Sequence, residues 1–200
     1  MLKIGITGGI GSGKTTVCKI FSQLGIPIYY ADVAARNLME HDQALISNLK
    51  REIGNHIYDE SNVLNKKLFG EIIFNNLESM TKANSFIHPA VAEDFKSWIG
   101  ENATAEYIIE EAAILFESGA NKNLDYVVTV TAPEKLRFAR VMQRDNITED
   151  YVKRISTAQI SEEEKKQLAD FVIVNDNKQL LIPQVLELHN RFLLLAESKK

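Results

Sequence analysis

The sequence predicts an α/β fold organised around a parallel sheet, and three features indicate it. Short apolar runs of strand length alternate with longer segments in which apolar residues recur at helical spacing. Several of the short runs are rich in β-branched residues, as buried strands are. A glycine-rich turn at residues 8–13 joins the first strand to the first helix. Strands separated by helices pair in parallel, so we expect an open sheet with ligands outside the carboxyl ends of its strands.

The glycine-rich turn carries the G-x-x-x-x-G-K-[ST] phosphate-loop pattern, from Gly8 to Thr15. Its glycines let successive N–H groups point at phosphate oxygens and add to the positive end of the following helix. We predict that Lys14 reaches the β- and γ-phosphates and that the Thr15 hydroxyl binds Mg²⁺. The alternative is a glycine-rich turn with a chance lysine. The predicted ATP contacts in this segment are Gly9, Ile10, Gly11, Ser12, Gly13, Lys14, Thr15 and Thr16.

Composition excludes several classes of protein. The 200 residues allow one core, or a core with an insertion. A net charge of −4 argues against a nucleic-acid binder with a basic face. No apolar run approaches the roughly 18 residues of a membrane helix, and the N-terminus lacks a signal-peptide pattern. The single cysteine, Cys18, fits a reducing cytoplasm and is interpreted as a packed thiol. We expect a cytoplasmic protein that binds neither nucleic acid nor membranes.

Asp32 follows the second expected strand, residues 26–31, and is a candidate active-site carboxylate. The alternative is a helix N-cap, because residues 33–39 look helical. Arg36 lies one helical turn further along the same face. It is expected to pair with Asp32 or to hold an anionic group of a substrate.

Residues 32–105 contain no convincing buried strand and are too many for a plain crossover connection. We interpret them as a helical insertion over the carboxyl edge of the sheet, where a phosphoryl-transfer enzyme would hold its acceptor. The histidines lack metal-ligand spacing, which argues against a zinc site. Taken alone, His88 is interpreted as a helix-entry residue before Pro89. The expected helices are 42–53, 65–75 and 88–100, with breaks at Gly54, Asn62 and Pro89.

The third expected strand, residues 106–111, ends in Glu111. Phosphate-loop proteins place a second magnesium-coordinating carboxylate, usually Asp, at such a strand end. Because Glu is one methylene longer, we expect its contact to the metal to pass through water. The alternative is a solvated strand end. Glu117 follows closely, in a helix or turn that begins after the strand.

A fourth strand is expected at residues 126–130, and Pro133 begins the next helix. On that helix Arg137, Arg140 and Arg144 share one face, although like charges at this spacing repel. We interpret the row as a lid whose arginines close on the triphosphate, the alternative being an ordinary solvated face. A fifth strand, residues 169–174, leads to Asn175, whose amide is expected to contact the nucleotide base.

The whole chain resembles the dephospho-coenzyme A kinase family. The residues that carry the resemblance are Thr7-Gly8-Gly9-Ile10-Gly11-Ser12-Gly13-Lys14, Ala31-Asp32 with Arg36, His88-Pro89, Leu115-Phe116-Glu117, Met142-Gln143-Arg144-Asp145, Gln159, and Ala169-Asp170 with Asn175. The phosphate loop alone is shared by many families, but this ordered set is specific. Three positions depart from the family pattern: Tyr30 and Glu111 replace aspartates, and Ala113 replaces a proline.

The resemblance implies a P-loop NTPase three-layer sandwich with a five-stranded parallel sheet in strand order 2-3-1-4-5. It also implies a nucleotide-binding core, a helical acceptor-binding insertion over 32–105 and a lid over 134–159. The core comprises 1–31, 106–133 and 160–200. The implied reaction is phosphorylation of the ribose 3′-hydroxyl of dephospho-coenzyme A by ATP with Mg²⁺, the last step of coenzyme A synthesis. We expect a monomer, or a weak oligomer, whose partners are ATP and dephospho-coenzyme A.

Within that reaction, we predict that Asp32 orients the acceptor hydroxyl and accepts its proton, and that arginines meet the charge of the transition state. The predicted catalytic residues are Lys14, Asp32, Arg140 and Arg144. The predicted acceptor contacts are Asp32, Arg36, His88 and Glu117, the metal ligands are Thr15 and Glu111, and Arg144 and Asn175 complete the ATP site.

Two alternatives to this function remain at the level of sequence. One is another P-loop kinase acting on a nucleoside, a nucleotide or a sugar acid, because such an enzyme would share every part except the acceptor domain. The other is a GTPase-type switch. Residues 121–125 superficially match the N-K-x-D guanine motif, but Asp125 is one residue too far along the chain.

Overall fold

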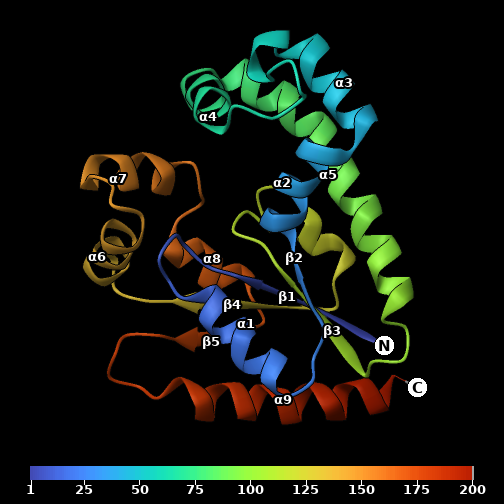
Figure 1. The fold of residues 1–200 in the computed structure, drawn as a ribbon. Coiled ribbons are helices and arrows are strands. Elements are labelled where there is room, and N and C mark those ends of the chain that lie inside the picture. The colour runs from blue at the N-terminus through green and yellow to red at the C-terminus, as the bar shows by residue number, and fades with distance from the viewer. Residues whose placement is uncertain (200) are drawn as a thin grey trace. The chain divides into compact units, whose positions relative to one another are not determined.

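A computed structural model describes residues 1–199 apart from the side chain of Phe74, and the chain forms two compact units. One unit combines Met1–Tyr30 with the chain from Glu101 onward, and the other is Ala31–Gly100. The first unit contains every strand of the sheet (Figure 1). The second unit is built from helices.

The five strands of the first unit all run parallel, in the order β2-β3-β1-β4-β5. They are β1 Leu2–Thr7, β2 Ile28–Tyr30, β3 Tyr107–Glu111, β4 Tyr126–Thr131 and β5 Phe171–Val174. This is the strand order that the family resemblance implies, so the expected fold class is confirmed. Because β1 lies between β3 and β4, its carboxyl end is central. Ile6 there stands opposite Glu111 of β3, and Thr7 opposite Thr129 of β4.

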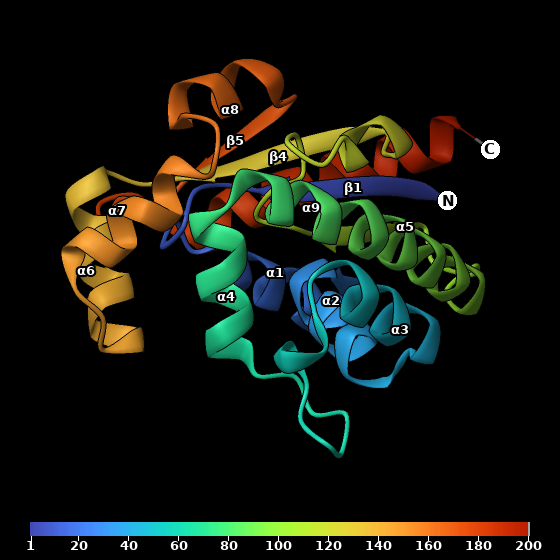
Figure 2. The ribbon, with the colours of Figure 1, turned by 90° about the horizontal axis from the view of Figure 1, so that it is seen from above.

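Helices cover both faces of the sheet (Figures 1 and 2). The helices of this unit are α1 Lys14–Gln23, α6 Glu134–Asp145, α7 Glu149–Thr157, α8 Glu162–Leu168 and α9 Leu181–Ser198, with a 3-10 turn η2 Ala120–Asn123. Helices α1 and α9 pack together on one face, and α8 packs against β4 on the other. Helix α8 falls in a stretch that the sequence analysis left without an element. Its start has a capping signal, because the Ser161 hydroxyl accepts the N–H of Glu164 at 3.1 Å.

Alternate residues of β1 meet different layers, as strand geometry requires. Ile4 and Ile6 are fully buried in the core under α1 and α9. Gly5 faces the opposite side, where an added Cβ would lie only 2.5 Å from Leu115 Cδ2. The absence of a side chain therefore lets the segment after β3 pack directly on the sheet. Cys18 is buried in the first core, and this burial raises the pKa of its thiol well above the usual value, as expected for a packed thiol.

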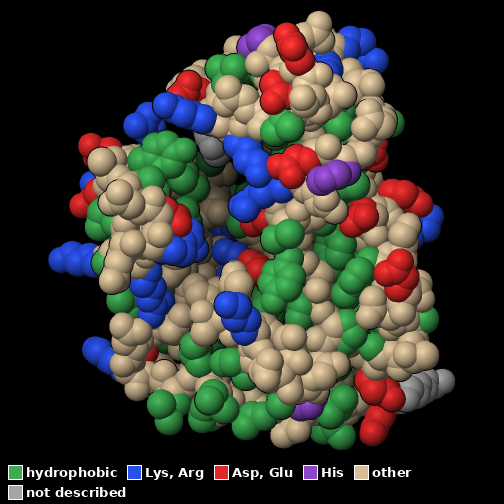
Figure 3. All heavy atoms as spheres, in the orientation of Figure 1, with side chains coloured by type: hydrophobic (Ala, Val, Ile, Leu, Met, Phe, Trp, Pro, Cys, Tyr) green, Lys and Arg blue, Asp and Glu red, His purple; other side chains and the backbone are tan. Residues whose placement is uncertain are grey.

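The outer face of α9 leaves apolar side chains at the surface. Ile182, Leu186 and Leu194 are exposed there. Figure 3 shows hydrophobic side chains along its lower edge, where Figure 1 places α9. Among residues 1–199, no helix combines the length and apolar content that crossing a membrane would require.

The second unit has its own apolar core. Its helices are α2 Ala31–His41, α3 Gln43–Glu52, α4 Lys66–Asn75 and α5 Leu77–Glu101, with a 3-10 turn η1 Asn55–Ile57. Residues of all four helices meet in one cluster that includes Met39, Leu49, Phe69 and Ile87. No strand of the sheet comes from the described residues of this unit, and its role as the acceptor-binding insertion stays a prediction.

The expected helix break at Pro89 is wrong, because α5 continues through that residue. Proline removes one backbone hydrogen bond and disfavours the helix interior. Ile87 on one side of it, and Ala90 and Val91 on the other, nevertheless pack into the same cluster. Burial on both sides of the proline holds the helix in one piece. His88 is therefore an interior helix residue, not a helix-entry residue.

Candidate active site

The phosphate loop connects β1, which ends at Thr7, to α1, which begins at Lys14. Gly13, at the N-cap, has the left-handed backbone angle φ of 99°. A Cβ at this position would also lie 2.1 Å from Nδ2 of Asn175. Both the conformation and the space therefore require glycine. The loop places the amino-terminal end of α1 at the carboxyl end of the central strand β1. The unpaired N–H groups and the positive end of the helix dipole lie there.

Lys14 lies across this loop and is 9% exposed. Its Nζ donates a hydrogen bond to the carbonyl oxygen of Gly8 at 3.0 Å. The ammonium group is thus held beside the loop at the start of α1. A fixed positive charge in this place suits the phosphates of a nucleotide.

The two predicted metal ligands are brought together. Thr15 is the second residue of α1, and Glu111 is the last residue of the neighbouring strand β3. The Thr15 hydroxyl donates to Oε2 of Glu111 at 3.3 Å. Mg²⁺ prefers oxygen ligands and usually takes one or two from the protein, with water and substrate phosphates filling the rest. A hydroxyl and a carboxylate at this distance fit that requirement. Among the described residues, no cluster of three or more His, Cys, Asp or Glu side chains offers a richer site.

The outer side of the loop is held by side chains from α6, from the linker between α7 and α8, and from the start of α8. The N–H of Gly9 donates to Oε1 of Glu162 at 2.7 Å, and the N–H of Ile10 donates to Oε1 of Gln159 at 3.1 Å. The carbonyl of Ile10 accepts a hydrogen bond from Nη1 of Arg137 at 3.3 Å. Two of the amides predicted to contact ATP therefore have protein acceptors in this structure, and their contact with the nucleotide stays a prediction.

Asn175 and Arg140 hold the second half of the loop. Nδ2 of Asn175 donates to the carbonyl of Ser12 at 2.8 Å. Arg140 donates from Nη2 to the backbone carbonyl of Asn175 at 3.1 Å and to Oδ1 of Asn177 at 2.6 Å, and from Nη1 to the carbonyl of Gly11 at 3.4 Å. The sequence analysis correctly placed Asn175 at the end of the last strand. Here its amide binds the loop and Arg140, so a contact to the base stays a prediction.

The arginine row of α6 does not act as one unit. Arg137 and Arg140 contact the phosphate loop, as described above. Arg144, one turn further, forms a bidentate pair with Asp145 at 2.7 and 2.6 Å. This hydrogen bonding raises the pKa of Arg144 and lowers that of Asp145. A role of Arg144 with the nucleotide stays a prediction.

Glu117 is engaged with the segment that leads into α8. Its Oε1 accepts the N–H of Ile160 at 2.9 Å and a hydrogen bond from Nζ of Lys165 at 3.1 Å. Lys165 is fully buried and also donates to the carbonyl of Ala113 at 3.0 Å. These bonds connect the turn after β3 to α8. Acceptor binding by Glu117 stays a prediction.

The other predicted acceptor residues belong to the second unit. Asp32 lies inside the first turn of α2, which begins at Ala31, so the alternative of an N-cap is wrong. Arg36 follows four residues later on the same helix, and both side chains are exposed. His88 lies in α5, where burial lowers the pKa of its imidazole. The roles of these three residues stay predictions.

Sequence reasoning missed Glu162 and gave Gln159 no role of its own. Glu162 begins a helix whose first three residues are all Glu, a pattern that by itself indicates only a favourable helix start. What distinguishes it is the position of α8 against β4, which no local pattern encodes. Gln159 was noted only as a family residue.

Comparison with known proteins agrees with this geometry. The family model described as dephospho-CoA kinase matches residues 2–180 of this chain. The chain belongs to the dephospho-CoA kinase family. A curated relative named dephospho-CoA kinase, from Bacteroides fragilis strain YCH46, is 37% identical over 187 residues, covering 94% of this chain and 91% of the relative.

Solved structures similar to this dephospho-CoA kinase family member share its full length. The crystal structure of TT1252 from Thermus thermophilus has a TM-score of 0.83 and 27% identity, covering 95% of this chain and 96% of the other. Dephospho-CoA kinase from Campylobacter jejuni has a TM-score of 0.70 and 25% identity, covering 99% and 98% of the two chains. The whole architecture, and not the phosphate loop alone, is therefore shared.

Proposed function

We propose that this chain phosphorylates the 3′-hydroxyl of the ribose of dephospho-CoA, using ATP, to give CoA and ADP. Membership of the dephospho-CoA kinase family over residues 2–180 carries the proposal. The phosphate loop with Lys14, and the pairing of Thr15 with Glu111, support the ATP-dependent part of the reaction. We assign ATP and dephospho-CoA as the partners, and a cytoplasmic monomer as the working form.

In the proposed mechanism, the loop amides and Lys14 bind the β- and γ-phosphates and hold the terminal phosphoryl group in place. Phosphoryl transfer through a loose transition state depends mainly on positioning and charge neutralisation. A bound Mg²⁺ would supply charge neutralisation for the phosphates. Thr15 and Glu111 would hold it, Glu111 directly or through water. The departure from Asp to Glu at position 111 is compatible with this role, because the carboxylate already reaches the Thr15 hydroxyl.

Asp32 is the proposed base. It orients the acceptor hydroxyl and takes its proton as the oxygen attacks phosphorus. An ordinary carboxylate suffices, because a loose transition state needs little help from a strong base. Arg36, His88 and Glu117 are proposed to bind the acceptor, with 32–105 as the acceptor-binding insertion. Arg140 and Arg144 are proposed to meet the transition-state charge, with 134–159 as the lid over a core made of 1–31, 106–133 and 160–200.

The decisive experiment measures ADP release in a coupled assay, with and without dephospho-CoA. We expect release that depends on dephospho-CoA and a product phosphorylated at the ribose 3′-position. A panel of other acceptors with labelled ATP tests the alternative kinases. A preference for a nucleoside monophosphate or a sugar acid would contradict the proposed acceptor. Equal binding of GTP and ATP, with slow hydrolysis and no acceptor activity, would favour a GTPase-type switch.

A further inference from the structure

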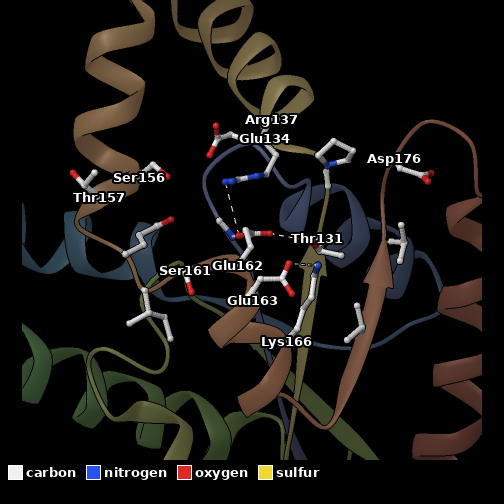
Figure 4. Close-up of a pocket in the computed structure, with 17 residues that line it drawn as sticks. Thr131, Glu134, Arg137, Ser156, Thr157, Ser161, Glu162, Glu163, Lys166 and Asp176 are labelled. Carbon is white, nitrogen blue, oxygen red and sulfur yellow. Dashed lines mark hydrogen bonds and ion pairs between the residues drawn. The ribbon is translucent and has the colours of Figure 1, made fainter.

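Glu162 contacts the phosphate loop from the side away from α1. Its Oε1 accepts the N–H of Gly9 at 2.7 Å, and its Oε2 accepts the hydroxyl of Thr131 at 3.1 Å. Nη1 of Arg137 lies 3.8 Å from Oε1. Figure 4 shows these side chains converging on the wall of a cavity of about 870 Å³. Both carboxylate oxygens of Glu162 are thus used, one of them by the loop backbone.

The electrostatics of this contact make it stronger than a surface hydrogen bond. The side chain of Arg137 is 5% exposed and that of Glu162 is 17% exposed. Nε of Arg137 is buried and has no hydrogen-bond partner among the described residues. Glu162 therefore supplies negative charge beside a buried guanidinium. A carboxylate that accepts a backbone N–H forms a charge-assisted bond, which is stronger than one between neutral groups.

The contacts reach one short stretch of the loop from two separate parts of the chain. Arg137 lies in the first turns of α6, whereas Gln159 and Glu162 follow the end of α7. Together they bind three neighbouring polar groups: the N–H of Gly9, the N–H of Ile10 and the carbonyl of Ile10. The first turn of the loop is therefore held by Arg137 and Gln159, near the two ends of the proposed lid, and by Glu162 just after it.

We propose that Glu162 is a positioning residue for ATP, which fixes the Gly9 peptide and so pre-forms the phosphate loop. The inference rests on the proposed function for the identity of the nucleotide. A loop already held in its binding conformation loses less conformational freedom when the nucleotide binds. Glu162 does not itself touch ATP in this account. Its effect reaches the phosphates through the backbone of residues 9–13.

The test is a titration of the full chain with ATP and with ADP, each with Mg²⁺ and without acceptor. We expect Glu162→Ala to raise both dissociation constants about tenfold, because a charge-assisted hydrogen bond to the loop is lost. Glu162→Gln keeps an oxygen that accepts the Gly9 N–H, so we expect it to bind within about threefold of wild type. Glu163→Ala is the matched control: its side chain is 78% exposed and pairs with Lys166. We expect this control to bind like wild type.

A second substitution tests the same contact from the loop. A Cβ on Gly9 would lie 2.2 Å from Oε1 of Glu162 and 2.4 Å from Nη1 of Arg137. The backbone angle of Gly9 lies outside the left-handed region, so alanine is tolerated there except for this clash. We expect Gly9→Ala to weaken nucleotide binding. We also expect Gly9→Ala with Glu162→Ala to weaken it by less than the product of the two single effects, because both remove one interaction.

Melting temperatures, measured for every variant, separate positioning from plain destabilisation. A merely structural role would lower the melting temperature of Glu162→Ala and leave its dissociation constants unchanged below the transition, which would overturn the inference. Equal weakening by Glu163→Ala would overturn it as well. The titration needs no acceptor. A wild-type chain that binds ATP but phosphorylates another acceptor would therefore contradict the proposed function alone.

Discussion

Glu110 is a buried carboxyl group whose ionisation opposes folding. In the sheet register it stands between Gly5 of β1 and Tyr29 of β2, and it is 5% exposed. Burial raises its pKa from the ordinary 4.5 to about 7. Between these two values, the folded chain keeps a proton that the unfolded chain has lost. The free energy of unfolding therefore falls as pH rises from about 4.5 to about 7. Above about pH 7 this group causes no further change.

The size of the effect follows from the same two values. At 1.36 kcal/mol per pKa unit, the difference corresponds to a loss of about 3 kcal/mol of stability above pH 7. Glu110→Gln keeps the shape of the side chain and cannot ionise. We expect it to raise the free energy of unfolding by up to about 3 kcal/mol at pH 8, and to change it by less than about 1 kcal/mol at pH 4.5.

Urea unfolding at both pH values, followed by circular dichroism, measures this difference. For slopes of about 2–3 kcal/mol per molar urea, the midpoint at pH 8 should rise by about 1 M. The control is Glu187→Gln, because Glu187 lies exposed on α9. A gain in stability that is equal at the two pH values, or absent at pH 8, would refute the assignment of an ionised and buried Glu110.

Four further substitutions test the site and its support. Lys14→Met removes the charge held at Gly8, and we expect a rate of ADP formation lower by about a hundred- to a thousand-fold in the coupled assay. Asp32→Asn should keep the ATP dissociation constant within about twofold while the turnover number falls at least a hundred-fold; turnover at the wild-type rate would contradict its role as base. Lys165→Met leaves Glu117 without its buried cation and should lower the free energy of unfolding by about 3–5 kcal/mol in urea. Adding Glu117→Gln should recover part of that loss, and a double variant less stable than Lys165→Met alone would show that the pair does not account for it.

The sequence was most informative where function and local backbone pattern coincide. The phosphate loop needs glycines at fixed spacing between a strand and a helix, so its place in the fold could be predicted from a short stretch. The sequence also placed Thr15 and Glu111 at the same edge of the sheet, because parallel strands end at one edge, and in the structure a hydrogen bond joins them. The strand order itself came from the family resemblance, since no local pattern states which strands are neighbours.

Local patterns failed where distant residues decide the structure. Pro89 predicted a break, but burial of residues on both sides of it in one core keeps α5 continuous. Glu162 looked like one of three solvated acids at a helix start, and only the packing of α8 on β4 brings it to Gly9. Arg144 belongs to a row that pointed to the nucleotide, yet its immediate neighbour Asp145 binds it in this structure.

The strand order also determines when the sheet can begin to form during synthesis. Strand β1 pairs with β3 and β4, and β2 pairs with β3, so neither of the first two strands has a partner until residues 107–111 exist. At about 5–20 residues per second, a ribosome needs about 5–20 s from the start of synthesis to reach the end of that stretch. During this interval the first two strands stay unpaired, whereas Ala31–Gly100 can form its own core as soon as residue 100 has been made, before β3 exists. Chaperones are therefore expected to bind the first thirty residues of early nascent chains, and not the helices that follow.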